Sequence, residues 1–268
     1  MGAFTRIDGV EMKKYLPAIG VGFFVLLVWQ GIVYTMSIPK YLFPSPLNVI
    51  LALRKHGFYM LVNLSITMEI AVTAFVISVV VGVVTSFVMV QSQKLENAIF
   101  PYVIIVQVTP IVALAPLIVL LVKDTFWALV LCAVLISIFP VISNTTLGLK
   151  SVSPGLIALF KMYQAGRWQT LLRLRVKSAL PYFFGSLKIT AGLSIVGAVV
   201  GGFVAGTSGA NSGLAYDILQ DGYNLEVSQM FASVFLLAVA GVAFFALMTF
   251  VNWFFLHKWH DSVVSQED

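Results

Sequence analysis

The sequence predicts an all-α membrane protein with about six transmembrane helices, and two features of its composition lead to this fold class. Of its 268 residues, 60% are hydrophobic and only 10% are charged, whereas a soluble domain has roughly 25% charged residues. The apolar residues also gather in stretches long enough to cross the hydrocarbon core, which takes about 20 helical residues. Lipid, rather than water, is therefore the expected solvent for most of the surface.

Six apolar stretches, almost free of charge, are expected to be the spans. Proline within them, as at Pro110, Pro116 and Pro140, is tolerated in membranes where neighbouring helices satisfy the freed backbone groups. The first stretch exceeds the apolar length of a cleaved signal, and no small-residue cleavage site follows it. The whole chain, 1–268, is expected to be one transmembrane domain, with spans at approximately 15–39, 66–93, 97–122, 125–149, 186–208 and 228–256 and a long loop at 150–185.

The distribution of Lys and Arg orients these spans, because cytoplasmic loops carry the excess of cations. If the N-terminus is cytoplasmic, four cations lie outside: Lys40, Arg54, Lys55 and Lys123. The other twelve of the sixteen then lie inside, namely Arg6, Lys13, Lys14, Lys94, Lys150, Lys161, Arg167, Arg173, Arg175, Lys177, Lys188 and Lys258. Both termini and the loop 150–185 are therefore expected to be cytoplasmic.

The loop 150–185 is too long and too patterned to serve only as a topology signal. From Pro154 the stretch "PGLIALFKMYQAGRW" predicts a helix with proline in its first turn. The following "LLRLRVK" alternates apolar and basic residues, which fits either a strand or a helix on the membrane surface with snorkelling cations. A simpler interpretation is that these cations only hold topology and touch anionic lipid.

The run "QAGRWQTLLRLRVKSALPYFFGSLKITAGLSIVGAVVGGFVAG" resembles the cytoplasmic loop and following helix of ABC-transporter permeases of the nitrate/sulfonate/taurine type. "YLFPSPLNVI" and "IVQVTPIVALAPLIVLL" resemble two other segments of that family. The resemblance implies a type I ABC importer permease in the bacterial inner membrane. It also implies three protein partners: a nucleotide-binding ATPase that holds ATP and Mg, an external solute-binding protein and a second permease copy, most simply the same chain.

The family's loop motif, Glu-Ala-Ala followed by Gly-Ala and a closing Leu-Pro, is degenerate here. Ala158 stands at the Glu position and Gln164 at the Gly position, and Gln favours helix more than Gly does. Leu180 and Pro181 match the closing pair. By the resemblance, the helix around 158–170 rests in a cleft of the ATPase. The residues expected to couple to it are Ala158, Leu159, Lys161, Met162, Tyr163, Gln164, Ala165, Gly166, Arg167 and Trp168.

Polar residues inside the spans are candidates for the translocation path. Glu69 is an ionisable group in the second expected span, which marks function by default, although it could equally lie among headgroups or pair with Arg54 or Lys55. Gln107, Thr109 and Pro110 make a polar break in the third, and such a break is tolerated only against protein or a cavity. Ordinary helix packing is the alternative role for these three residues.

Glycines four residues apart in the fifth expected span predict close helix packing. The pairs are Gly197 with Gly201 and Gly202 with Gly206. No cluster of His, Cys or carboxylate residues indicates a metal or a catalytic site, and no G-x-x-x-x-G-K-[ST] cradle for ATP occurs. The chain is accordingly expected to be neither an enzyme nor a nucleic-acid-binding protein, and to hold no cofactor itself.

The main alternative function is a stand-alone secondary transporter or channel, which predicts coupling charges within the spans or inverted repeats. A membrane-embedded enzyme ranks below it. The cargo stays open between a thiamine-pyrimidine precursor or other heterocycle and a sulfonate, nitrate or bicarbonate, because the family's external binding protein selects it.

Overall fold

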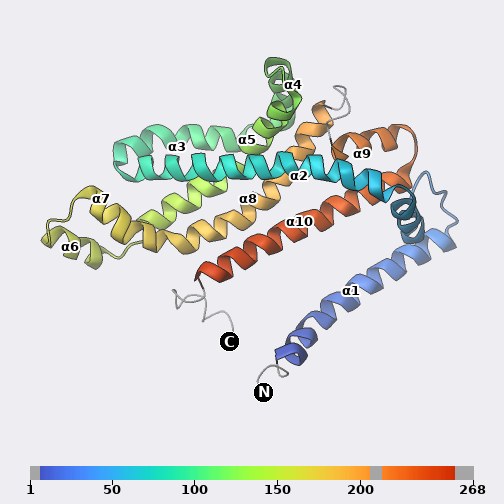
Figure 1. The fold of residues 1–268 in the computed structure, drawn as a ribbon, viewed down its shortest axis with the longest axis horizontal. Helices are drawn as coiled ribbons and strands as arrows, with labels where there is room; N and C mark the ends of the chain where they lie inside the picture. Colours follow the sequence, from blue (N-terminus) through green and yellow to red (C-terminus); the bar gives the residue numbers. More distant parts are fainter. Residues whose placement is uncertain (1–6, 206–212, 257–268) are drawn as a thin grey trace. The chain divides into compact units, whose positions relative to one another are not determined.

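The computed structural model describes residues 7–205 and 213–256, and every regular element in those two ranges is helical (Figure 1). This confirms the all-α fold class. The elements are α1 (Ile7–Thr35), α2 (Pro46–Val90), α3 (Gln93–Val108), α4 (Ile111–Leu121), α5 (Thr125–Lys150), α6 (Pro154–Met162), α7 (Arg167–Thr170), the π-helix η1 (Leu171–Arg175), α8 (Val176–Ala205), α9 (Leu214–Tyr223) and α10 (Val227–Leu256).

Four helical segments of the described chain are long and apolar enough to cross a membrane. They are Pro46–Val90, Thr125–Lys150, Arg167–Ala205 and Val227–Leu256, and the bent pair of α3 and α4 would make a fifth. The first expected span, 15–39, falls on α1, whose part Gly20–Thr35 is a shorter apolar helix.

The third expected span, 97–122, is not one straight helix. It consists of α3 and α4, which meet at a bend of 97° (Figure 1). The break falls at Thr109 and Pro110, where both residues leave the helical region with ψ values of 126° and 102°. Proline cannot donate a backbone hydrogen bond, and it pushes the preceding residue into extended backbone. The break itself was predicted from these residues, but its sharpness was not.

The chain divides into two compact units, and the larger contains 61–216 and 236–268. Within it α5 and α8 pack against each other over an extensive contact. Gly197 and Gly201 permit this contact, since a Cβ on Gly197 would lie only 2.5 Å from the Cα of Ala133. Close approach of backbones over small residues is how membrane helices gain packing energy when lipid offers no hydrophobic drive.

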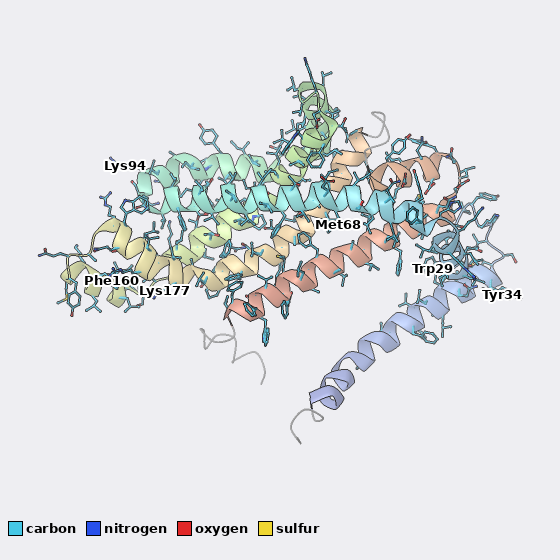
Figure 2. The ribbon with its side chains drawn as sticks, viewed as in Figure 1. Trp29, Tyr34, Met68, Lys94, Phe160 and Lys177 are labelled. Atoms are coloured by element: carbon cyan, nitrogen blue, oxygen red, sulfur yellow. The ribbon has the colours of Figure 1, made fainter. Side chains whose placement is uncertain are left out.

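Buried serines join α2 to α5 on another side of the same core. The hydroxyls of Ser78 and Ser137 lie 2.9 Å apart, and Ser86 donates to the carbonyl of Ile142 at 3.0 Å. Gly82 likewise permits close approach, because a Cβ at this position would lie 2.7 Å from Cγ1 of Val141. The hydroxyls of Ser78, Ser86 and Ser137 are thus hydrogen-bonded within the helical core, as an apolar surrounding favours. Figure 2 shows Lys94, Phe160 and Lys177 toward one end of this unit, with Met68 farther along α2.

The smaller unit contains 1–60 and 217–235. Its packing centres on three aromatic rings, Trp29, Phe43 and Phe231, whose centroids lie 5.6–5.8 Å apart. These separations lie in the range of favourable tilted and edge-to-face pairs. The hydroxyl of Tyr59 also donates to Asp217 at 3.1 Å, which attaches the start of α2 to α9.

Asp221 on α9 makes the stability of the smaller unit depend on pH. Burial of the carboxyl and, secondarily, the charges of Asp217 and Glu226 raise the pKa of Asp221 from 3.8 to about 6. A raised pKa means that the protonated form is favoured by folding, so this contribution is complete below pH 3.8 and is lost as the pH rises through 6. We expect Asp221→Asn to raise the melting temperature at pH 7 and to flatten its pH dependence between pH 4 and 6. Parallel melting profiles of variant and parent in detergent would contradict this.

Candidate functional site

Helix α6 (Pro154–Met162) is apolar, yet none of its residues is buried. Met162 and the adjoining Tyr163 are 81% and 80% exposed, and Leu156 and Leu159 are also exposed. A nine-residue helix is marginal without tertiary support, and a contiguous exposed apolar surface indicates an interaction site. We call the segment 154–170 the coupling segment.

The single helix expected from Pro154 through Trp168 is wrong, because a turn interrupts it after α6. The helix ends at Met162, and Gln164 takes a left-handed conformation with φ +53°. The N–H of Ala165 donates to the carbonyl of Phe160, and that of Gln164 to Lys161, both at 3.0 Å. This pair of bonds is the Schellman motif that ends helices, usually with glycine at the left-handed position. The higher helix propensity of Gln relative to Gly therefore does not describe position 164, because this residue ends the helix.

A second short helix follows the turn. Gly166 precedes α7 (Arg167–Thr170), and its N–H donates to the side-chain oxygen of Gln169 at 3.1 Å. The stretch "LLRLRVK" then continues as η1 and the start of α8, so the helical alternative for it is correct and the strand is wrong. Leu171 and Leu174 are buried, whereas Leu172 is exposed.

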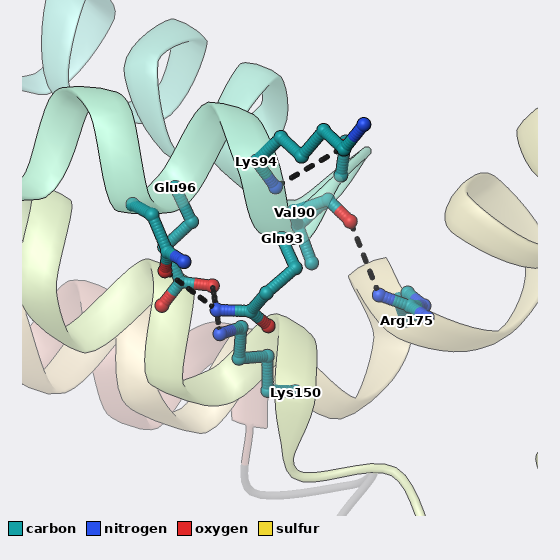
Figure 3. A network of polar contacts seen from close by, with 8 residues as sticks. Val90, Gln93, Lys94, Glu96, Lys150 and Arg175 are labelled. Atoms are coloured by element: carbon teal, nitrogen blue, oxygen red, sulfur yellow. Dashed lines mark hydrogen bonds and ion pairs between the residues drawn. The ribbon is translucent and has the colours of Figure 1, made fainter.

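A polar network joins the ends of α2, α3, α5 and η1 beside the coupling segment (Figure 3). Lys150 forms an ion pair with Glu96, and Gln93 donates to Glu96 and Asn97 at 3.2 and 3.0 Å. Arg175 reaches the carbonyl of Val90 at 3.5 Å, where a cation complements the negative end of a helix. The sequence offered no signal for this network, because its partners lie 54 and 85 residues apart.

A pocket of about 300 Å³ lies between the coupling segment and the end of α2. Lys161, Ala165 and Arg167 line it from one side, and Val90 and Gln91 from the other. The coupling segment is thus incompletely packed against its own chain. Of its ten expected coupling residues, Ala165 is half-buried and the other nine are exposed, namely Ala158, Leu159, Lys161, Met162, Tyr163, Gln164, Gly166, Arg167 and Trp168.

The structure brings some of the expected path residues together and leaves one apart. Gln107 and Thr109 line a pocket of about 230 Å³ together with residues of α5 and α8, and Pro110 is the exposed residue at the break. Glu69 is exposed on α2 and does not line that pocket. The described residues record no ion pair for Glu69.

Among the expected packing glycines, Gly197 and Gly201 face α5. A Cβ on Gly201 would meet Leu129 and Cys132 at 3.1 and 3.2 Å. Gly202 is buried, whereas Gly206 lies outside the described residues.

Comparison with known proteins finds related sequences among transport permeases. The chain is 32% identical over 241 residues to the formylaminopyrimidine transport permease protein ThiX of Halalkalibacterium halodurans, covering 88% of this chain and 94% of that one. It is 32% identical over 214 residues to the riboflavin transport system permease protein RibX of Chloroflexus aurantiacus, covering 76% and 78%. The nitrate import permease protein NrtB of Synechococcus elongatus is 20% identical over 262 residues, covering 92% and 91%.

A solved structure supports the fold. The inward-facing MetNI methionine ABC transporter matches with a TM-score of 0.59 at 19% identity, covering 73% of this chain and 96% of that chain, so the fold is that of a type I ABC importer permease.

Residues 76–257, which include the coupling segment, Gln107, Thr109 and Gly197, match the model of a protein family described as the binding-protein-dependent transport system inner membrane component. The chain is therefore a multi-pass inner-membrane protein that belongs to the family of binding-protein-dependent transport permeases.

Proposed function

We propose that this chain carries a small solute across the membrane and that the coupling segment docks onto a separate nucleotide-binding ATPase. The observation that carries the docking is the exposed apolar surface of α6 and the adjoining Tyr163, where Leu159 and Met162 are also uncovered. An amphipathic helix laid in a groove is a common mode of protein recognition. Family membership supports an ATPase and an external binding protein as partners.

The polar network gives the coupling segment a mechanical connection to the spans. Arg175 contacts the end of α2, and Lys150 at the end of α5 pairs with Glu96 of α3. A pull on the coupling segment would therefore reach three spans at once. ATP and Mg would bind the partner, and its nucleotide-dependent closure would shift the population between inward-facing and outward-facing states through different contacts in each.

The translocation path would pass the break between α3 and α4, where Gln107 and Thr109 line a pocket, and would be completed by a second copy of the chain. The relatives transport cargoes as different as formylaminopyrimidine, riboflavin and nitrate, by their names. An external binding protein would deliver the cargo.

Replacing Gln164 by Pro and Arg167 by Glu tests the docking. Proline fixes φ near −65° and is incompatible with the observed φ of +53°, so the turn cannot form, and the second change reverses an exposed charge. We expect at least a tenfold loss of ATPase recovered with the tagged full-length chain from its native membranes, measured by mass spectrometry and ATP hydrolysis.

The matched control is Gln164→Gly with Arg167→Lys, which keeps both the turn and the charge. Glycine adopts left-handed backbone without strain, so this control should retain the ATPase and melt no lower than the parent. Membrane insertion should be equal for both variants. Undiminished recovery of ATPase with the Pro/Glu variant would show that the coupling segment does not dock it.

A further inference from the structure

The pocket at the bend between α3 and α4 combines apolar walls with a few polar groups. Leu135 and Ile136 of α5 and Leu193 and Val200 of α8 form the walls. Gln107 and Thr109 contribute an amide and a hydroxyl. Mostly apolar walls with a small number of placed polar groups are typical of sites for small organic ligands.

The broken helix adds backbone N–H donors to this pocket, beside the hydroxyl of Thr109. Ile111 and Val112 line it, and they precede the first backbone bond of α4, in which Ala113 donates to Pro110 at 2.9 Å. Their N–H groups have no partner within the helix, and Pro110 supplies no side-chain cap. The hydroxyl of Thr109 donates to Ile105 at 2.6 Å, which leaves its oxygen free to accept. A ligand here meets both donors and acceptors.

The pocket carries no net charge. None of the side chains that line it is ionisable, and the adjoining runs Thr125–Gly148 and Ile189–Tyr216 contain no charged residue. The positive end of α4 meets the negative end of α3 at the break, so the two helix dipoles offset one another. An ion at membrane depth needs a countercharge, and nitrate, a sulfonate or bicarbonate would find none in this pocket.

The volume of the pocket indicates the size of ligand that it accepts. A dry cavity of about 150 Å³ accepts benzene, and this pocket measures about 230 Å³. One ring with small substituents fits that volume. We propose that the pocket binds a single uncharged ring with hydrogen-bonding substituents, a heteroaromatic cargo, with Gln107 as the residue that recognises its polar edge. This rests on the proposed function, because it assigns the cargo of the same path.

Equilibrium binding to the full-length chain in nanodiscs tests the assignment, with radiolabelled formylaminopyrimidine as the probe and nitrate and taurine as competitors. We expect saturable binding of the ring and no competition from these two small charged solutes. Gln107→Leu should weaken binding about tenfold, the loss of one amide hydrogen bond, and Thr109→Val should weaken it severalfold.

Thr85→Val is the matched control, because Thr85 on α2 makes the same bond to its own helix, to Val81 at 2.8 Å, and does not line the pocket. It should bind the ring as the parent does. Absence of ring binding, competition by nitrate or taurine, or unchanged binding in both pocket variants would each overturn the assignment. ATPase recovery with the parent chain separates the two hypotheses: no ring binding by the parent while ATPase is recovered rejects only this inference, and ring binding by the parent with undiminished ATPase recovery by the Pro/Glu variant rejects only the docking.

Discussion

Gly197→Ala is expected to separate α5 from α8 and to lower the stability of the permease by about 1–3 kcal/mol, the usual cost of overpacking. The added Cβ would lie 2.5 Å from the Cα of Ala133 and 3.3 Å from its carbonyl oxygen. Backbone atoms cannot rotate away as a side chain can, so the two helices must move. Because α5 and α8 share an extensive contact in the larger unit, thermal unfolding in detergent should report the loss directly, and transport should fall with it.

Gly192→Ala provides a control on the same helix. No atom lies within 4 Å of the Cβ position at Gly192, and alanine is favoured over glycine in a helix by about 0.8–1.0 kcal/mol. The control is therefore expected to stabilise while Gly197→Ala destabilises. Equal effects of the two substitutions would mean that α5 and α8 do not approach as closely as the structure shows.

Features of the fold that depend on local chemistry could be predicted from the sequence. The break at Thr109 and Pro110 was predicted from a proline that stands beside polar residues, whereas Pro116 and Pro140 lie within continuous helices. The spacing of Gly197 and Gly201 indicated a close helix contact. The partner of that contact, Ala133, could not be predicted, because 64 residues separate it from Gly197 (197 − 133) and small residues occur on several spans.

The position of the candidate site along the chain could be predicted from the sequence, but its three-dimensional structure could not. The basic, patterned loop indicated the coupling segment, yet Gln164 gave no sign of the left-handed turn that it forms, because glycine is the usual residue there. The hydrogen bonds of Ala165 and Gln164 to α6 hold the turn despite the residue. Likewise, no pattern pairs Lys150 with Glu96, since ion pairs between helices depend on their packing.

Gly213→Ala is expected to have the second large effect, on the start of α9. Gly213 has φ +67°, and left-handed backbone costs roughly 1–2 kcal/mol for a residue with a side chain. A Cβ there would also lie 2.3 Å from the hydroxyl oxygen of Thr67. That oxygen accepts a hydrogen bond from the N–H of Leu214 at 3.0 Å. Backbone strain at position 213 and displacement of the Thr67 side chain therefore act together, and we expect the free energy of unfolding to fall by ~3 kcal/mol.

Two further variants separate the causes of that loss. Asn tolerates left-handed backbone but carries a Cβ, so Gly213→Asn should remain nearly as damaging as Gly213→Ala if the collision with Thr67 dominates. Gly222→Ala, also on α9, meets only Met230 at 3.7 Å and should be tolerated. Hydrogen exchange at Leu214 and Ala215 should accelerate in the Gly213 variants and stay slow in the Gly222 variant. Since Thr67 lies on α2 within the same unit as Gly213, a parent-like exchange rate in Gly213→Ala would show that the Thr67 hydrogen bond does not hold the start of α9.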